Sequence, residues 1–367
     1  MFDLKKGLPG RVRFLDGLRG IAAIYVVIFH AYEEIVANPT TSIPSTMKFI
    51  LDALLCGNIP VDIFIVLSGF CLMLSIVRSE GTEIPGGLFA FFKRRSKRIL
   101  IPYYAAWALS TAAVLAVPSL TLIPGIPWYH AGSPLNPTVI VSHILLFQNL
   151  KPSWQTEINV PLWSVATEWQ IYFLFPLLLL PLWRKYGLVS LGVVSAAIGI
   201  LFAVPNLLVG GRLWLVALFS AGMIAAVLSH KSVVPSKRYL LSICIPAFAT
   251  TLIGHMLILR PSILSFILSD YLVGIGTAAG LLIMCNSDRV SFLASGALYR
   301  LGLFSYSLYL CHAPVIAVVH AITWHFRLSP LASLASQFFI SVPLSVLVSY
   351  LFHCLFERPL LRKPAAL

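Results

Sequence analysis

Arg19 and His30 are the residues whose types and spacing most directly suggest chemistry. Both lie in a long apolar run that opens at residue 14, where an ionisable side chain is costly and is by default a functional candidate. They are eleven positions apart, so at about 100° per residue they share one helix face, roughly 16 Å apart along the axis. This arrangement suits a ligand that is charged at one end and reacts at the other. An interfacial anchor together with a packed polar histidine explains the pair equally well.

Three more polar residues fall at a similar depth within other apolar runs: Ser68, Glu168 and His312. Counting from the ends of the runs puts them, with His30, in the middle third of a membrane. Each would cost about a few kcal/mol if it faced lipid, so we expect the four to share one interior cavity. Polar contacts that only join helices are the alternative, and this interpretation is preferred for Ser68.

A pair of arginines precedes the third apolar run. Arg95 and Arg98 are three positions apart, on the same side of a helix, and guanidinium groups suit bidentate binding of phosphate. Together with Arg19 they form a candidate clamp for a phosphorylated ligand at the cytoplasmic side. Ordinary anchoring by basic residues at the inner membrane surface is the alternative.

Acidic residues at helical spacing are placed to support these groups. Asp16 precedes Arg19 by three positions and is expected to hold its guanidinium in place. Glu33 and Glu34 follow His30 by about one turn, where either could tune its basicity or face the outer surface. Glu33 has the better helical spacing.

These residues need apolar helices to position them, and the composition supplies such helices. The chain of 367 residues is 59% hydrophobic and 11% charged, with a mean hydropathy of +0.90, which excludes a water-soluble globule. We therefore expect an all-α, polytopic membrane bundle of about ten spans. The expected spans are 18–37, 58–77, 99–120, 161–183, 188–205, 212–229, 239–259, 263–285, 303–324 and 331–355.

The distribution of basic residues explains the net charge of +13. With the N-terminus in the cytoplasm, 21 of the 26 Lys and Arg residues fall in inner segments, a positive-inside pattern that predicts cytoplasmic N- and C-termini and does not require nucleic acid. We expect one membrane domain over 1–367, without a removable signal peptide or an appended soluble domain. The six cysteines show neither a metal-binding spacing nor a disulfide framework.

Several short motifs are distributed along nearly the whole chain. Each of them alone is weak evidence for a protein family. They are Arg13–Ala22 with His30, Val61–Phe70, Arg95–Arg98 with Pro102 and Tyr103, Trp163 and Ser164 with Glu168 and Gln170–Tyr172, Gly302–His312, and Glu357–Pro359. As an ordered set they resemble the integral-membrane acyltransferase family 3, whose members O-acylate carbohydrates and some other acceptors. One mild departure is Ala166-Thr167, where Ser-Val is frequent in the family.

The resemblance implies a multi-pass enzyme of the bacterial inner membrane. Such an enzyme would move an acyl group, usually acetyl, from cytoplasmic acyl-CoA to a hydroxyl of a carbohydrate. The stand-alone form of the family points to a surface polysaccharide, an exopolysaccharide or a lipid-linked precursor. Its implied partners are acyl-CoA, the carbohydrate acceptor and the bilayer, with a homo-oligomer or polysaccharide-assembly proteins as further candidates. No metal is implied.

The resemblance also assigns roles to residues. His30 would act as general base on the acceptor hydroxyl or as a transient acyl carrier. Glu168 or His312 would orient His30 or donate to the developing oxyanion. The residues implied to bind the CoA phosphates are Arg19, Arg95 and Arg98, and those implied to support the site are Asp16, Glu33, Ser68, Trp163 and Tyr309.

Two rival functions fit parts of the same sequence. A transporter or flippase for a glycan or related anionic solute also uses polar groups at the membrane midplane. Against it, the chain shows no repeat halves and no matching pair of Gly/Pro-interrupted spans. A catalytically silent assembly partner is the second rival, and the intact Arg19 and His30 pair argues against it.

Overall fold

A computed structural model provides the structure of the chain. It describes residues 12–36, 43–54, 56–79, 83–117, 136–203, 209–257 and 262–361. Parts of four expected spans, at 37, 118–120, 204–205 and 258–259, lie outside the described residues. The same holds for residues 1–11 and 362–367, and so for the two termini that the sequence assigns to the cytoplasm.

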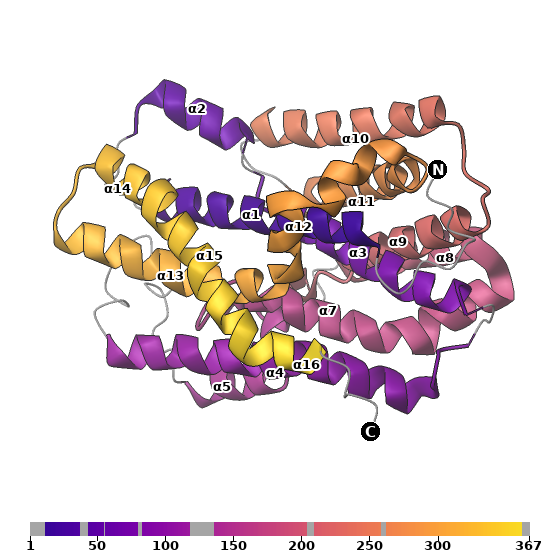
Figure 1. The fold of residues 1–367 in the computed structure, drawn as a ribbon, viewed down its shortest axis with the longest axis horizontal. Coiled ribbons are helices and arrows are strands. Elements are labelled where there is room, and N and C mark those ends of the chain that lie inside the picture. The colour runs from indigo at the N-terminus through magenta and orange to yellow at the C-terminus, as the bar shows by residue number, and fades with distance from the viewer. Residues whose placement is uncertain are drawn as a thin grey trace. The chain divides into compact units, whose positions relative to one another are not determined.

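Helices make up the regular structure of the described ranges, and no strand occurs in them (Figure 1). The helices are α1 (Arg13–Val36), α2 (Ser45–Leu54), α3 (Asn58–Val77), α4 (Gly87–Ala116), α5 (Pro137–Ile144), α6 (Pro152–Gln155), α7 (Leu162–Leu174), α8 (Leu180–Ala203), α9 (Leu215–His230), α10 (Lys237–Leu257), α11 (Ile263–Cys285), α12 (Gly296–Leu303), α13 (Ser305–His325), α14 (Pro330–Ser336), α15 (Val342–Phe352) and α16 (Arg358–Leu361). Wide π-helical turns join α7 to α8 (Phe175–Leu179), α14 to α15 (Gln337–Ser341) and α15 to α16 (His353–Glu357). Short 3-10 turns are Gln148–Leu150, Val209–Gly211 and Asp288–Ala294.

Eight helical runs in the described ranges are long and apolar enough to cross a membrane. They confirm the predicted all-α, multi-pass class. One of them, Leu162–Leu201, covers most of the expected spans 161–183 and 188–205, which meet at a kink where Gly187 has a φ of 80°. Only glycine adopts this backbone conformation without strain. The expected span 212–229 is the shorter helix α9, which has 16 residues.

The chain folds into two compact units that interleave along the sequence. Unit 1 comprises Met1–Ala22, Cys56–Phe91 and Glu168–Gly302, and unit 2 comprises Ala23–Leu55, Phe92–Thr167 and Leu303–Leu367. Boundaries fall inside α1, α4, α7 and, before its last residue, α12, so each of these helices contributes residues to both units.

Small residues bring helices of unit 1 into close contact. A Cβ atom added to Gly69 of α3 would lie 2.0 Å from the backbone oxygen of Phe219, and one added to Gly222 of α9 would lie 2.0 Å from that of Val66. The two glycines therefore let the backbones of α3 and α9 touch. Such contacts stabilise membrane helices, because lipid tails leave little hydrophobic drive for association.

A polar stripe marks the last long helical run, in unit 2. Its six members recur at every fourth position and are all buried: Gln337, Ser341, Ser345, Ser349, His353 and Glu357. Four residues turn an α-helix by about 400°, so such a stripe drifts around a regular helix by about 40° per step. The two π-helical turns lie at the ends of the stripe and counter this drift. Leu347 and Leu355, between the polar positions, are exposed.

Candidate active site

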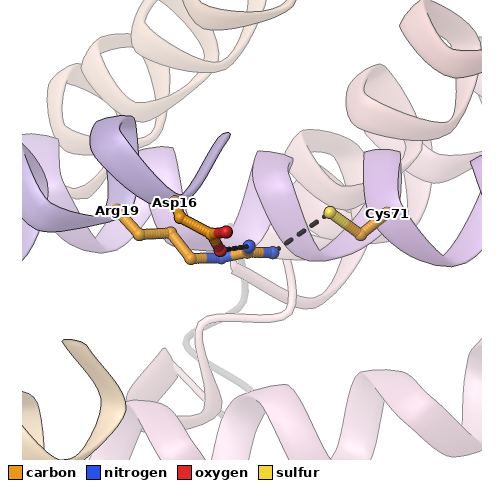
Figure 2. A network of polar contacts seen from close by, with 3 residues as sticks. All are labelled: Asp16, Arg19 and Cys71. Atoms are coloured by element: carbon orange, nitrogen blue, oxygen red, sulfur yellow. Dashed lines mark hydrogen bonds and ion pairs between the residues drawn. The ribbon is translucent and has the colours of Figure 1, made fainter. Parts of the chain in front are cut away.

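The guanidinium of Arg19 is held by two side chains of unit 1. Its Nη1 donates to Oδ1 of Asp16 over 3.3 Å, which confirms the contact predicted from the spacing in α1. Its Nη2 lies 3.1 Å from Sγ of Cys71 on α3 (Figure 2). Asp16 is buried, whereas the side chain of Arg19 keeps 19% of its surface exposed. Arg19 is thus fixed in place and still able to meet a ligand.

Close backbone contacts explain why α1 is fixed at this position. A Cβ on Gly302 of α12 would lie 1.7 Å from the backbone oxygen of Asp16, and one on Gly20 would lie 2.1 Å from that of Leu298. Gly17 makes an equally close approach to Leu293. The Gly residues that flank Arg19 in the sequence motif therefore have a packing role, and they set the position of the guanidinium.

Ser68, Glu168 and Tyr172 form a second polar cluster in unit 1. The Ser68 hydroxyl donates to Oε1 of Glu168 over 2.8 Å and lies 2.7 Å from the hydroxyl of Tyr172. Tyr172 donates to the same carboxylate oxygen over 2.5 Å. The cluster joins α3 to α7, which agrees with the preferred interpretation of Ser68 as a contact between helices.

The imidazole of His30 lies in unit 2 beside a carboxylate and a second imidazole. Its Nδ1 is 2.9 Å from Oε2 of Glu33, the neighbour that has the better helical spacing. The centroid of its ring is 5.2 Å from that of His312 on α13. The side chain of His30 is 23% exposed, whereas His312 is fully buried. Of the four polar residues expected at the same depth, the structure thus pairs His30 with His312 and Ser68 with Glu168.

The predicted supporting residue Tyr309 lies next to this histidine pair. Its ring centroid is 5.9 Å from that of His312, and its hydroxyl is 2.6 Å from the hydroxyl of Ser164 on α7. The amide of Asn159 donates to the backbone oxygen of Leu310 over 2.9 Å. These contacts tie the residues before and within α7 to the part of α13 that carries His312.

Nearly the whole sequence matches one protein family. The acyltransferase-domain family Acyl_transf_3 matches residues 12–354. The chain belongs to this family. Among curated proteins it is 34% identical over 106 residues to protein 2 in the picA locus of Rhizobium radiobacter, and 26% identical over 170 residues to acyltransferase MdmB of Streptomyces mycarofaciens. The alignments cover 28% and 46% of this chain and 46% and 39% of those proteins, so the chain spans less than half the length of the curated relatives. No solved structure matches it.

Family membership and the apolar helices together make the chain a multi-pass membrane protein of the acyltransferase-domain family. The contacts described above do not include three of the predicted site residues. Arg95 and Arg98 occupy the first half of α4, where Arg98 is exposed and Arg95 half-buried. Trp163 is half-buried near the start of α7. The phosphate-binding role of the two arginines and the supporting role of Trp163 stay predictions.

Sequence reasoning missed several side-chain partners in this chain. Tyr172 follows Glu168 by four positions, and this helical spacing could have identified it. Cys71, Ser164 and Asn159 are different, because each meets a partner from a distant part of the chain. In the described ranges, no group of three or more His, Cys, Asp or Glu residues is arranged to hold a metal ion.

Proposed function

We propose that this acyltransferase moves an acetyl group from cytoplasmic acetyl-CoA to a hydroxyl of a carbohydrate acceptor, with His30 as general base. The observation that carries the proposal is the 2.9 Å contact between Nδ1 of His30 and the carboxylate of Glu33. A carboxylate accepts hydrogen bonds, so Nδ1 carries the hydrogen and Nε2 has the lone pair that a base needs.

The reaction balances with His30 as the proton carrier. Nε2 takes the proton of the acceptor hydroxyl while its oxygen attacks the thioester carbonyl and forms the new C–O bond. When the C–S bond breaks, the imidazolium returns the proton to the sulfur, and CoA leaves as a thiol. Glu33 stabilises the imidazolium between these steps, as a carboxylate does beside a catalytic histidine. Attack by Nε2 on the thioester, giving a transient acyl-imidazole, is the variant of this mechanism.

We propose that Arg19 binds the phosphates of the acyl donor. Its guanidinium is fixed by Asp16 and retains exposed surface, as a phosphate-binding group requires. Arg19 and His30 are eleven residues apart in the sequence, a spacing that corresponds to roughly 16 Å along a helix. We propose that this separation serves a donor whose phosphates and thioester are joined by a long flexible arm. Arg95 and Arg98 are further candidates for the phosphates.

The names of the relatives support acyl transfer but do not identify the acceptor. The Streptomyces protein is named as an acyltransferase, whereas the name of the Rhizobium protein gives no activity. We propose a surface polysaccharide, an exopolysaccharide or a lipid-linked precursor as the acceptor, and the bacterial inner membrane as the location. Analysis of surface glycans by mass spectrometry, with and without the protein, tests this through the loss of an acetyl mass.

Transfer of radiolabelled acetyl from acetyl-CoA, in membranes that contain the protein, tests the function directly. We expect label in ester-linked carbohydrate, and its loss with His30→Ala. His255→Ala is the matched control, because His255 is an exposed residue of α10. Normal transfer by a correctly inserted His30→Ala protein would rule out His30 as the base, and absence of transfer by the unaltered protein would rule out the proposed activity.

A further inference from the structure

One ring nitrogen of His312, Nε2, accepts no hydrogen bond from the described part of the chain. The side chain is fully buried, and its Nδ1 lies 3.0 Å from the backbone oxygen of Leu308. Because a carbonyl oxygen only accepts, Nδ1 carries the hydrogen, and Nε2 of the neutral ring has a lone pair. No donor in the described part of the chain reaches this Nε2. A buried acceptor left in this state destabilises the folded protein.

The neighbouring ring of His30 does not satisfy this acceptor. In the neutral ring with Nδ1 donating to Glu33, Nε2 of His30 also has a lone pair. Two lone pairs do not form a hydrogen bond, although the ring centroids are only 5.2 Å apart. The pair therefore presents two accepting nitrogens from adjacent rings. Two neighbouring O–H donors on one ligand are the chemical complement of two such acceptors.

We propose that the acceptor offers a vicinal diol to this pair. The reacting hydroxyl donates to Nε2 of His30, and the hydroxyl on the neighbouring carbon donates to Nε2 of His312. This inference rests on the proposed function, which makes His30 the base, and adds a binding role for His312. It also selects the site of acylation, because the modified hydroxyl must have a free hydroxyl beside it. In this arrangement His312 accepts from the substrate and donates nothing to the oxyanion.

Two substitutions of His312 separate this role from proton transfer. His312→Gln keeps an accepting oxygen near the position of Nε2 but takes up no proton, and His312→Leu removes the acceptor. We expect His312→Leu to lower kcat/KM for the acceptor at least about 10-fold, and His312→Gln to stay within about 3-fold of the unaltered protein. If His312 relays a proton, the two variants lose activity equally. Equal loss overturns the proposal, as does full activity of His312→Leu.

Binding of radiolabelled acetyl-CoA to the purified proteins serves as the folding control. We expect all His312 variants to bind it with unchanged affinity. A variant that has lost this binding is misfolded, and His312→Asn and His312→Met then provide the second pair. Asn keeps an amide on a shorter side chain and Met carries no strong acceptor, so the same ranking of Asn over Met is expected.

Periodate, which cleaves vicinal diols, tests the chemistry of the acceptor itself. The probe is a carbohydrate extract from cells of the source organism that lack this protein, oxidised with periodate and then reduced. We expect the purified protein to transfer labelled acetyl to the mock-treated extract and to lose at least about nine-tenths of this transfer with the oxidised one. Undiminished transfer to the oxidised extract overturns the diol. Absence of transfer to either extract contradicts the proposed function instead.

Discussion

Glu33 and Glu34 are neighbours in sequence but differ in their relation to His30. Glu33 is half-exposed and its carboxylate meets Nδ1 of His30, whereas Glu34 is buried and its Oε1 has no partner in the described ranges. The three-residue spacing in α1 accounts for the first contact. Only Glu33 is therefore placed to fix the tautomer of His30 and to stabilise its protonated form.

We predict that Glu33→Gln lowers acetyl transfer at least about 10-fold, because an amide stabilises the imidazolium less than a carboxylate does. Glu34→Gln is the matched control and is expected to leave the rate unchanged. The measurement is the rate of label transfer from acetyl-CoA, corrected for the amount of inserted protein. Equal rates for the two variants would contradict the role of Glu33.

At the scale of helices, hydropathy and local spacing predicted much of what the structure contains. The apolar runs predicted the long helices, and the contacts of Arg19 with Asp16 and of His30 with Glu33 follow from positions one turn apart. The pairing of Ser68 with Glu168, and of His30 with His312, depends on how separate helices pack. Counting residues from the ends of the apolar runs put these four at one depth in the membrane. It could not predict their partners, because it does not say how each helix is rotated about its axis or which helices are neighbours.

Helix packing in unit 1 yields a prediction at Gly222. Gly222→Ala would place a Cβ 2.0 Å from the backbone oxygen of Val66, so α3 and α9 must separate. We expect a loss of roughly 1–3 kcal/mol in the free energy of unfolding. Gly254→Ala on α10 is the control, because nothing lies within 4 Å of the added Cβ. Thermal unfolding in detergent measures both, and a Gly222→Ala protein as stable as Gly254→Ala would refute the close contact.

The short helix α5 predicts a dependence of stability on pH. Burial of His143 lowers its pKa from 6.5 to about 4. Between pH 6.5 and about pH 4, the unfolded chain therefore binds more protons at this histidine than the folded chain does. The free energy of unfolding decreases as pH falls through this range. We expect His143→Gln to flatten the decrease in Tm between pH 7 and pH 4.5, and His325→Gln, an exposed control on α13, to leave it unchanged. If Tm decreases as much in the His143→Gln protein, other titratable groups cause the decrease.

At the scale of the whole molecule, charge predicts the orientation in the membrane. Basic residues gather in the segments assigned to the cytoplasm, and few lie in those assigned to the outside. Lys151 and Lys231 are exposed residues that belong to opposite sides in this assignment. Their accessibility from outside the cell therefore reports the orientation.

We predict that Lys151→Cys reacts with a membrane-impermeant maleimide added to intact spheroplasts, and that Lys231→Cys reacts only after the membrane is opened. The experiment uses a background in which the six native cysteines are replaced. Labelling of Lys231→Cys in intact spheroplasts, with protection of Lys151→Cys, would reverse the orientation.

The polar stripe of the last helical run has a consequence for how this protein tolerates insertions and deletions. One residue removed between Ser345 and Ser349 would rotate one half of the run against the other by about 100°. Hydroxyl groups on one half would then turn from the protein interior toward lipid tails. Length variation among homologues is thus expected in the connecting segments, while this stretch keeps a constant number of residues even where its apolar side chains diverge.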